Sequence, residues 1–408
     1  FTSRNLSKGV LMRVLILFLF SIFAFSEDYY PGADWQSIEA VEVGLDEEKI
    51  ERLFELSFED DSTMSAVLIR DGYIVKEQYA EGFDKNSFGT SWSTAKSFYA
   101  ALVGISLDRG EIDSLDDPVS KYVSSYRTDE KQNITIRQIL NMTSGLEFPE
   151  HEHEMMFFES DHLKYAENVG VENPPGEVFQ YNNVNSMMIG EILKGATGKT
   201  AKTLIEERIF SQIGLTDYTA WEDEAGNTMT YCCLDMSARD YSKFGLLFSR
   251  DGKWGDKQII SKNYVDESLQ LYWGKTPDMG WSHSDTRGYS LQWWISKYDD
   301  DAKIYNTSGK FGQFVFIDKE RDIIFTRITK YYPGPGDVQQ WGALGYLRFL
   351  GSVNRAIAVS RFLMAIGLIS LDDGSVRTPY TNEDGESREF YQNYVKIVDS
   401  IADLELDD

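Results

Sequence analysis

Residues 91–98 read Ser-Trp-Ser-Thr-Ala-Lys-Ser-Phe, and the rest of the chain can be organised around this stretch. From Lys96 onward the sequence is mostly apolar as far as Gly110, which predicts a helix that ends at this glycine. Residues three apart lie one turn apart on a helix face, so the amine of Lys96 can reach the hydroxyl of Ser93. A serine needs a neighbouring base to become a strong nucleophile, and burial lowers the pKa of a lysine. The stretch therefore predicts a serine nucleophile with a lysine base.

The tetrapeptide from Ser93 to Lys96 also has a simpler explanation. A serine at the start of a helix often caps it, while a lysine in the first turn stays in water. Taken by itself, the tetrapeptide fits that explanation better, because Ser-x-x-Lys occurs by chance in long chains. The assignment of a nucleophile therefore depends on motifs further along the chain.

The composition is that of a globular protein with a large core. The 408 residues are 42% hydrophobic and 14% aromatic, which suits one large domain or two interleaved ones. The formal net charge of −26 would repel phosphate groups. Neither a nucleic acid nor an anionic membrane is therefore an expected partner, and the oligomeric state stays open.

Two cysteines, Cys232 and Cys233, stand next to each other. Adjacent cysteines rarely bridge, so we expect two buried small side chains, with pairing to another chain as the alternative. The chain lacks the Cys and His spacing of a zinc site, and the alternating Glu and His of residues 150–154 favour a solvated acidic segment over a metal site. We expect neither a metal nor an organic cofactor.

The first 26 residues have the pattern of a secretory signal peptide. Met12 is the natural start, Arg13 is basic, and residues 14–26 are apolar with a small-residue end. The mature chain would begin near Glu27 and be exported, to the periplasm or the medium, with no membrane contact of its own. The apolar run is short for a membrane span, although an uncleaved anchor remains an alternative.

The elements expected along the chain indicate an α+β fold. A β-hairpin is predicted around Asp71 and Gly72, and antiparallel strands are predicted in the last third. Thr135 would begin a helix and Gly145 would stop it. The other expected helices span about 184–196, 200–215, 235–250, 337–350 and 353–371, and the expected late strands span 289–295, 304–309, 314–318 and 323–328.

These elements predict an antiparallel sheet flanked by helices, with a helical subdomain at about 93–250 inserted in the sheet domain. The domain would cover residues 27–371. Residues 372–408 would form an acidic tail, loose apart from a possible helix near 388–404. Residues 147–173 are polar and aromatic, which favours a flap over the site.

Three motifs in this order resemble those of the serine β-lactamase and penicillin-binding-protein superfamily. They are Ser93-x-x-Lys96, Tyr181-x-Asn183, and the glycine-rich stretch 307–313, Thr-Ser-Gly-Lys-Phe-Gly-Gln. The resemblance covers about residues 45–350. It is greatest to the class C-like branch, which includes DD-peptidases, esterases with a β-lactamase fold and 6-aminohexanoate-dimer hydrolases. It implies the β-lactamase/transpeptidase-like version of the α+β fold.

The resemblance also implies a role for each motif residue. Ser93 would form an acyl-enzyme, Lys96 would help to deprotonate it, and Tyr181 would pass the proton to the leaving group. Asn183 would orient Lys96 and the substrate. The N–H groups of Ser93 and Lys310 would form the oxyanion hole, and Ser308 and Gly309 would help to orient the substrate. Without the resemblance, Tyr181 fits a packed aromatic residue and Asn183 a helix cap.

The third motif departs from the resemblance at Thr307. β-Lactamases and DD-peptidases usually carry Lys-Thr-Gly or His-Thr-Gly here, and this cation meets the substrate carboxylate, whereas the present triplet is Thr-Ser-Gly. We therefore expect hydrolysis of an ester or a small amide rather than efficient β-lactam hydrolysis. Trp92, Tyr99 and residues 155–158 would favour an apolar acyl group, unless they belong to the core. The alternatives are a β-lactamase or DD-peptidase, and a non-catalytic binding protein of the same fold.

Overall fold

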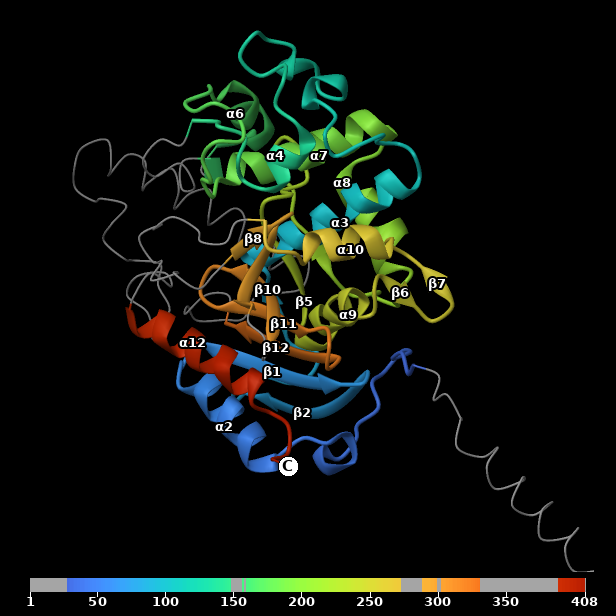
Figure 1. Cartoon of the computed structure of the whole chain (residues 1–408), viewed down its shortest axis with the longest axis vertical. Helices are drawn as coiled ribbons and strands as arrows, with labels where there is room; N and C mark the ends of the chain where they lie inside the picture. The colour runs from blue at the N-terminus through green and yellow to red at the C-terminus, as the bar shows by residue number, and fades with distance from the viewer. Residues whose placement is uncertain are drawn as a thin grey trace, which may run out of the picture.

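A seven-stranded antiparallel sheet forms the centre of the protein (Figure 1). The structure is a computed structural model, and it describes residues 28–147, 156–157, 159–272, 288–298, 302–330 and 388–407. The strand order is β2-β1-β12-β11-β10-β9-β8. The strands are β1 (Thr63–Arg70), β2 (Tyr73–Tyr79), β8 (Gly288–Ser290), β9 (Trp293–Tyr298), β10 (Lys303–Gly309), β11 (Gln313–Asp318) and β12 (Ile323–Thr329).

Strand β1 lies inside the sheet although it comes first along the chain. It pairs with β2 through the predicted turn at Asp71 and Gly72, and with β12 from the other end of the sheet domain. Val67 and Ile69 point to the core on one face, while Ala66 and Leu68 point to the core on the other. Both faces of β1 are apolar because helices cover both faces of the sheet.

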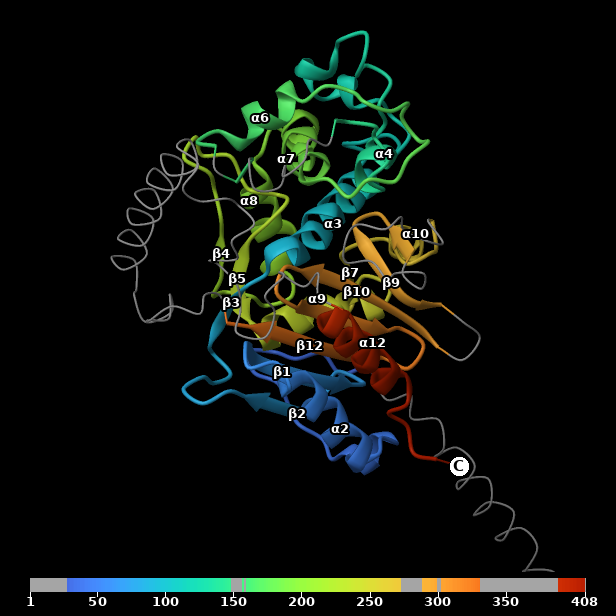
Figure 2. The same ribbon diagram turned by 90° about the vertical axis from the view of Figure 1, so that its left-hand side faces the viewer.

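Helices α2 (Glu47–Phe58) and α12 (Arg388–Ala402) lie side by side on one face, as Figures 1 and 2 show. The predicted late helix near 388–404 is therefore present. It belongs to the core on this face of the sheet, because five of its apolar side chains are buried there: Phe390, Tyr394, Ile397, Val398 and Ile401.

The helical part of the chain covers the opposite face of the sheet (Figure 2). Helix α9 (Ala238–Ser249) packs on β1, β11 and β12, and α3 (Ala95–Asp108) lies beside β10. The remaining helical elements are α4 (Ile136–Leu140), α6 (His162–Asn168), α7 (Asn183–Thr197), α8 (Ala201–Ile205), a π-helical turn (Glu206–Phe210) and α10 (Lys262–Ser268). No helix in these described ranges is long and apolar enough to cross a bilayer.

Short elements complete the described chain. A small sheet has the order β3-β5-β4, and β6 pairs with β7 in a two-stranded ribbon. These strands are β3 (Phe88–Thr90), β4 (Thr219–Ala220), β5 (Leu234–Ser237), β6 (Lys253–Trp254) and β7 (Lys257–Gln258). The 3₁₀ turns are Ala40–Val43, Trp92–Thr94, Val119–Lys121 and Ser124–Tyr126. The observed order of sheet and helices confirms the predicted α+β class, an antiparallel sheet flanked by helices.

Three boundaries differ from the prediction. The segment 289–295 is two strands rather than one, because Leu291 and Gln292 adopt positive φ angles and reverse the chain. The predicted helix 235–250 begins later, since residues 234–237 pair in the small sheet before Ser237 caps α9. The predicted helix 200–215 is two shorter pieces, α8 and the π-helical turn.

The predicted stop of α4 was also wrong. Thr135 caps this helix in a capping box with Gln138, as expected. The helix nevertheless ends at Leu140, because Met142 turns the chain with φ 58°. Gly145 has φ 74° and lies against the carbonyl of Asn173, so a glycine is needed there for a close backbone approach. The predicted signal peptide and the helices expected at 337–371 lie outside the described residues.

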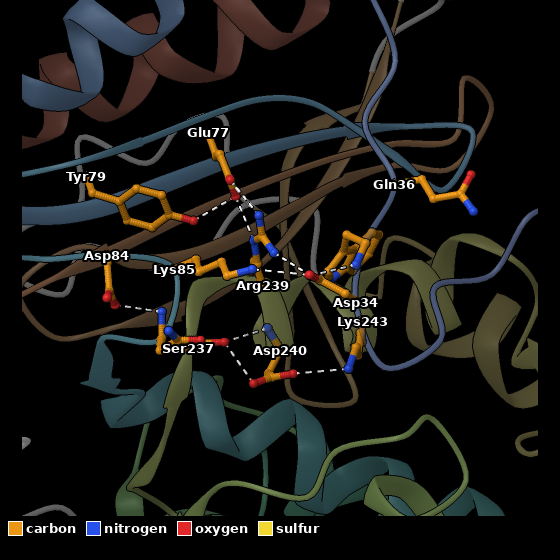
Figure 3. A network of polar contacts seen from close by, with 12 residues as sticks. Asp34, Gln36, Glu77, Tyr79, Asp84, Lys85, Ser237, Arg239, Asp240 and Lys243 are labelled. Carbon is orange, nitrogen blue, oxygen red and sulfur yellow. Dashed lines mark hydrogen bonds and ion pairs between the residues drawn. The ribbon is translucent and has the colours of Figure 1, made fainter.

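A polar network joins the start of α9 to β2, the strand at one edge of the sheet (Figure 3). Arg239 donates to both carboxylate oxygens of Glu77, at 2.7 and 2.5 Å, and to Asp34 at 2.6 Å. The hydroxyl of Tyr79 also donates to Glu77, at 2.7 Å. Because a guanidinium presents its donors in a rigid fork, this network fixes the first turn of α9 against β2 and the N-terminal segment.

Candidate active site

Ser93 lies in the 3₁₀ turn Trp92–Thr94, directly before α3. The turn is held by β5, because the N–H of Ser91 donates to the carbonyl of Leu234 and the N–H of Leu234 donates to Oγ of Ser91, both at 2.8 Å. On the other side, Oγ1 of Thr94 donates to the carbonyl of Gln313 at 3.1 Å. These contacts leave Ser93 half-buried at the junction between the small sheet and the large one.

Lys96 is buried, and its amine has two close oxygen neighbours. Nζ lies 2.7 Å from Oγ of Ser93 and 2.7 Å from the carbonyl oxygen of Tyr231. Burial holds the pKa of Lys96 well below its usual value, which favours the uncharged amine. A carbonyl oxygen only accepts, so the contact with Tyr231 uses an N–H. The lone pair of the amine can then face the hydroxyl of Ser93 and take its proton.

Tyr181 lies beside this pair. Nζ of Lys96 is 5.1 Å from the centre of the Tyr181 ring. The ring stacks on Trp294, with centroids 5.5 Å apart, and meets Tyr289 edge-on at 6.2 Å. The three motif residues predicted from the sequence, Ser93, Lys96 and Tyr181, are thus brought together in one place.

Asn183 takes a position different from the one expected. Its neighbour Asn182 caps α7 by accepting from the N–H of Val184 at 2.7 Å, so Asn183 is the first residue of the helix. Oδ1 of Asn183 is buried and has no hydrogen-bond partner in the described part of the chain. The expected contact between Asn183 and Lys96 is therefore not formed, since the carbonyl of Tyr231 accepts from the amine instead.

The end of β10 lies against the nucleophile turn. Gly309 approaches the carbonyl of Ser91 so closely that a Cβ atom would overlap it. Oγ1 of the buried Thr307 donates to Oγ1 of Thr94 at 3.3 Å. The pairing of β10 with β9 reaches only as far as Asn306, so Ser308 and Gly309 lie beyond the paired part of this strand. Lys310 follows in the turn, with Nζ 5.5 Å from the ring centre of Phe311.

Sequence reasoning missed three residues near this site. Tyr231, whose carbonyl contacts Lys96, also contacts His162. Asp235 is buried on β5, the strand that holds the nucleophile turn. Asp235 accepts from Thr90 at 2.5 Å and from the indole of Trp221 at 2.7 Å, and burial raises its pKa to about 6. No spacing in the sequence marks these residues, because their partners are far away along the chain.

The two cysteines are both buried, as expected. The side chains of Cys232 and Cys233 lie directly against each other. The acidic segment 150–154 lies outside the described residues, as do Met155 and Phe158 of the predicted flap. Met156 and Phe157 are described, and Phe157 lies near Trp92 with ring centroids 6.2 Å apart.

Comparison with known proteins gives one family. The model of the family named Beta-lactamase matches residues 58–346. The 6-aminohexanoate-dimer hydrolase of Paenarthrobacter ureafaciens is 21% identical over 310 residues, which cover 71% of this chain and 78% of that protein.

Two solved structures show the same fold. A candidate 6-aminohexanoate-dimer hydrolase from Bacillus anthracis has a TM-score of 0.63 at 20% identity, covering 84% of this chain and 91% of that one. A family VIII carboxylesterase has a TM-score of 0.57 at 19% identity, covering 71% of this chain and 94% of that one. Since the family model spans more than half of the chain, this protein belongs to the Beta-lactamase family.

Proposed function

We propose that the protein is a serine hydrolase that cleaves ester or small amide bonds through an acyl-Ser93 intermediate. Membership of the Beta-lactamase family makes it a hydrolase of the β-lactamase fold. The observation that carries the serine mechanism is the 2.7 Å distance between Oγ of Ser93 and the buried amine of Lys96. A buried, uncharged amine at hydrogen-bond distance is what a serine needs to lose its proton near neutral pH.

The proposed reaction begins with proton transfer from Oγ of Ser93 to Nζ of Lys96. Oγ then attacks the carbonyl carbon of the substrate, and the negative charge on its oxygen is met by the N–H groups of Ser93 and Lys310. The leaving alcohol or amine receives the proton from Lys96 by way of the phenol of Tyr181. In the second half, a water molecule gives a proton to the same groups while its oxygen attacks the acyl carbon. The bond from this carbon to Oγ of Ser93 then breaks, Oγ takes the proton back, and the acid is released.

The substrate class rests on the relatives and on Thr307. The relatives carry the names 6-aminohexanoate-dimer hydrolase and carboxylesterase, which supports amide and ester bonds. Thr307 is neutral and is already bonded to Thr94, so it offers no cation to a substrate carboxylate. Two groups of aromatic rings near the site suit an apolar acyl group. Phe157 and Phe311 lie near Trp92, the residue before Ser93. Trp294 and Tyr289 lie near Tyr181. Export also belongs to the proposal, and rests on the pattern of residues 1–26 alone.

The test compares p-nitrophenyl butyrate with nitrocefin as substrates of the mature protein. We expect ester turnover that is lost in Ser93→Ala and Lys96→Met, with little cleavage of nitrocefin. The matched control is Lys194→Met, which removes an exposed lysine of α7 and should keep full turnover. Labelling with a fluorophosphonate should modify the wild type but not Ser93→Ala.

The other outcomes of this test separate the alternatives. Fast nitrocefin cleavage would make the protein a β-lactamase in spite of Thr307. If small esters stay intact but D-Ala-D-Ala peptides are cleaved, it acts as a DD-peptidase. If neither substrate turns over and the fluorophosphonate leaves Ser93 unlabelled, the chain is a binding protein that keeps the fold.

A further inference from the structure

We propose that His162 and Tyr231 form a positioning pair that holds the amine of Lys96 in its reactive, dehydrated state. The inference rests on the proposed serine mechanism and adds two residues to it. Neither residue would touch the substrate, and neither would give or take a proton in the reaction. Both act through Lys96, which Tyr231 contacts directly.

The first step is the contact between Tyr231 and Lys96. The carbonyl oxygen of Tyr231 lies 2.7 Å from Nζ, and the centre of its ring lies 5.9 Å from the same atom. With the ring of Tyr181 at 5.1 Å, the amine sits between two tyrosines. These two rings carry the titratable groups that face Lys96 from the neighbouring elements. Any movement of Tyr231 therefore changes both the orientation of the amine and its access to water.

The second step is the contact between Tyr231 and His162. The hydroxyl of Tyr231 lies 3.1 Å from Nδ1 of His162, and both side chains are buried, with 3% and 4% of their surface exposed. Burial lowers the pKa of His162, so the imidazole is neutral near pH 7. Nδ1 can then accept the O–H of Tyr231. A hydrogen bond between buried groups is costly to break, so it fixes the tyrosine side chain.

The third step is the place of His162 in the fold. It is the first residue of α6, and its N–H donates to Oδ2 of Asp223 at 2.9 Å. The carboxylates of Asp223, Asp161 and Glu159 raise the pKa of the imidazole, against the larger effect of burial. These contacts anchor the histidine at the start of α6.

The ring of His162 also links Tyr231 to the residue before the nucleophile. Its centroid lies 6.3 Å from that of Phe157, and the centroid of Phe157 lies 6.2 Å from that of Trp92, which precedes Ser93. Contacts thus run from Trp92 through Phe157 and His162 to Tyr231, and back to Lys96. The segment that contains Phe157 and His162 is in this way coupled to the catalytic lysine.

Loss of the hydrogen bond between Tyr231 and His162 should raise the pKa of Lys96. Its pKa is low because the amine is buried. If Tyr231 loses its hydrogen bond and moves, water reaches the amine and stabilises its charged form. The pKa of Lys96 then rises, and the reactive form appears only at higher pH.

The experiment uses Tyr231→Phe, His162→Phe and the double variant, with His162→Gln as the conservative replacement that can still accept from Tyr231. Two quantities are measured. One is the pH profile of kcat/KM for p-nitrophenyl butyrate. The other is the titration of the Lys96 side chain by NMR in protein with ¹³C-labelled lysine, assigned with Lys96→Met. The second measurement needs no activity, so it tests the pair even if the proposed function fails.

We expect Tyr231→Phe and His162→Phe each to move the Lys96 titration and the acid limb of kcat/KM to higher pH by about one unit. The double variant should be no worse than either single variant, because the two residues act as one unit. His162→Gln should recover most of the wild-type profile.

The matched control is Tyr264→Phe. Tyr264 is buried, and its hydroxyl donates to the carbonyl of Ala100 in α3 at 2.6 Å. This variant also loses a buried hydroxyl next to α3, so it should lower the melting temperature without moving the titration of Lys96. If the Tyr231 and His162 variants behave like this control, or if their effects add, the positioning pair is refuted.

Discussion

Gly309, the last residue of β10, packs directly on the carbonyl oxygen of Ser91, two residues before the nucleophile. A Cβ atom at position 309 would overlap this oxygen, so the contact exists only because the residue is a glycine. The close approach brings the backbone of Gly309 and Lys310 beside the turn that carries Ser93. It brings together the two segments, more than 200 residues apart, that carry the donors of the proposed oxyanion hole.

Gly309→Ala should therefore lower activity sharply. The methyl group must push β10 away from the turn, which moves the N–H of Lys310 relative to that of Ser93. Loss of one oxyanion donor typically lowers kcat by about 100-fold or more, and we expect an effect of this order. Steady-state kinetics with p-nitrophenyl butyrate would measure it.

The control for this change is Gly32→Ala, because a Cβ atom at Gly32 meets nothing within 4 Å. This variant should keep its activity and its melting temperature. Full activity in Gly309→Ala would mean that the close approach of β10 has no part in catalysis.

The pH profile of the wild type should report the buried amine of Lys96. The uncharged amine is the reactive form, and burial lowers its pKa. Activity is therefore lost as the pH falls through this lowered pKa, and it reaches its plateau well below the pH at which an ordinary lysine loses its proton. An ordinary lysine would keep kcat/KM rising to about pH 10. A profile that rises that far would contradict an uncharged Lys96 in the resting enzyme.

Asp235 should make the protein less stable as the pH rises from about 4 to about 6. Its pKa is raised to about 6 by burial, so between these values the folded state binds a proton that the unfolded chain has lost. The stabilisation is fully present below about pH 4 and disappears above pH 6. The change amounts to about 3 kcal/mol in the free energy of unfolding.

Asp235→Asn removes this titration and keeps acceptor and donor atoms for Trp221 and Thr90. Urea unfolding would measure the free energy of unfolding of both proteins. We expect the variant to become more stable relative to the wild type as the pH rises from 4 to 7. The exposed Asp217→Asn serves as the control and should leave the difference constant. A constant difference for Asp235→Asn as well would show that the pKa of Asp235 is the same in the folded and the unfolded chain.

Gln292 should be essential for stability because it joins three elements around the site. Its side-chain amide donates to the carbonyl of Leu140 at 2.7 Å and accepts from Ser186 at 2.8 Å, and its carbonyl accepts from Ser97 at 2.7 Å. Gln292→Glu has the same shape but offers a buried carboxylate to the carbonyl of Leu140. We expect a loss of about 3 kcal/mol in the free energy of unfolding.

Thermal unfolding of Gln292→Glu would check this prediction. The exposed Gln132→Glu, which makes the same chemical change in water, should melt within a degree or two of the wild type. If both variants melt alike, the hydrogen bonds of Gln292 contribute nothing to the fold.

Several features that depend on neighbours along the chain were predicted correctly, although some element boundaries were not. The α3 helix, the hairpin at Asp71 and the cap at Thr135 each follow from side chains within a few residues of one another. The contact between Ser93 and Lys96 belongs to this group, because the helical repeat places residues three apart on one face. Tyr181 came from a resemblance between motifs, and the structure now places its ring near Lys96.

Only the tertiary structure decided what surrounds the amine of Lys96. The carbonyl of Tyr231 comes from a segment 135 residues away, and the ring of His162 is a further contact that no repeat in the sequence marks. The burial of α12 in the core and the approach of Gly309 to Ser91 depend in the same way on distant partners. The sequence alone determined the chemical groups and their local spacing. Tertiary packing decided which of these groups are buried together away from water, because burial and close contact are properties of the folded chain as a whole.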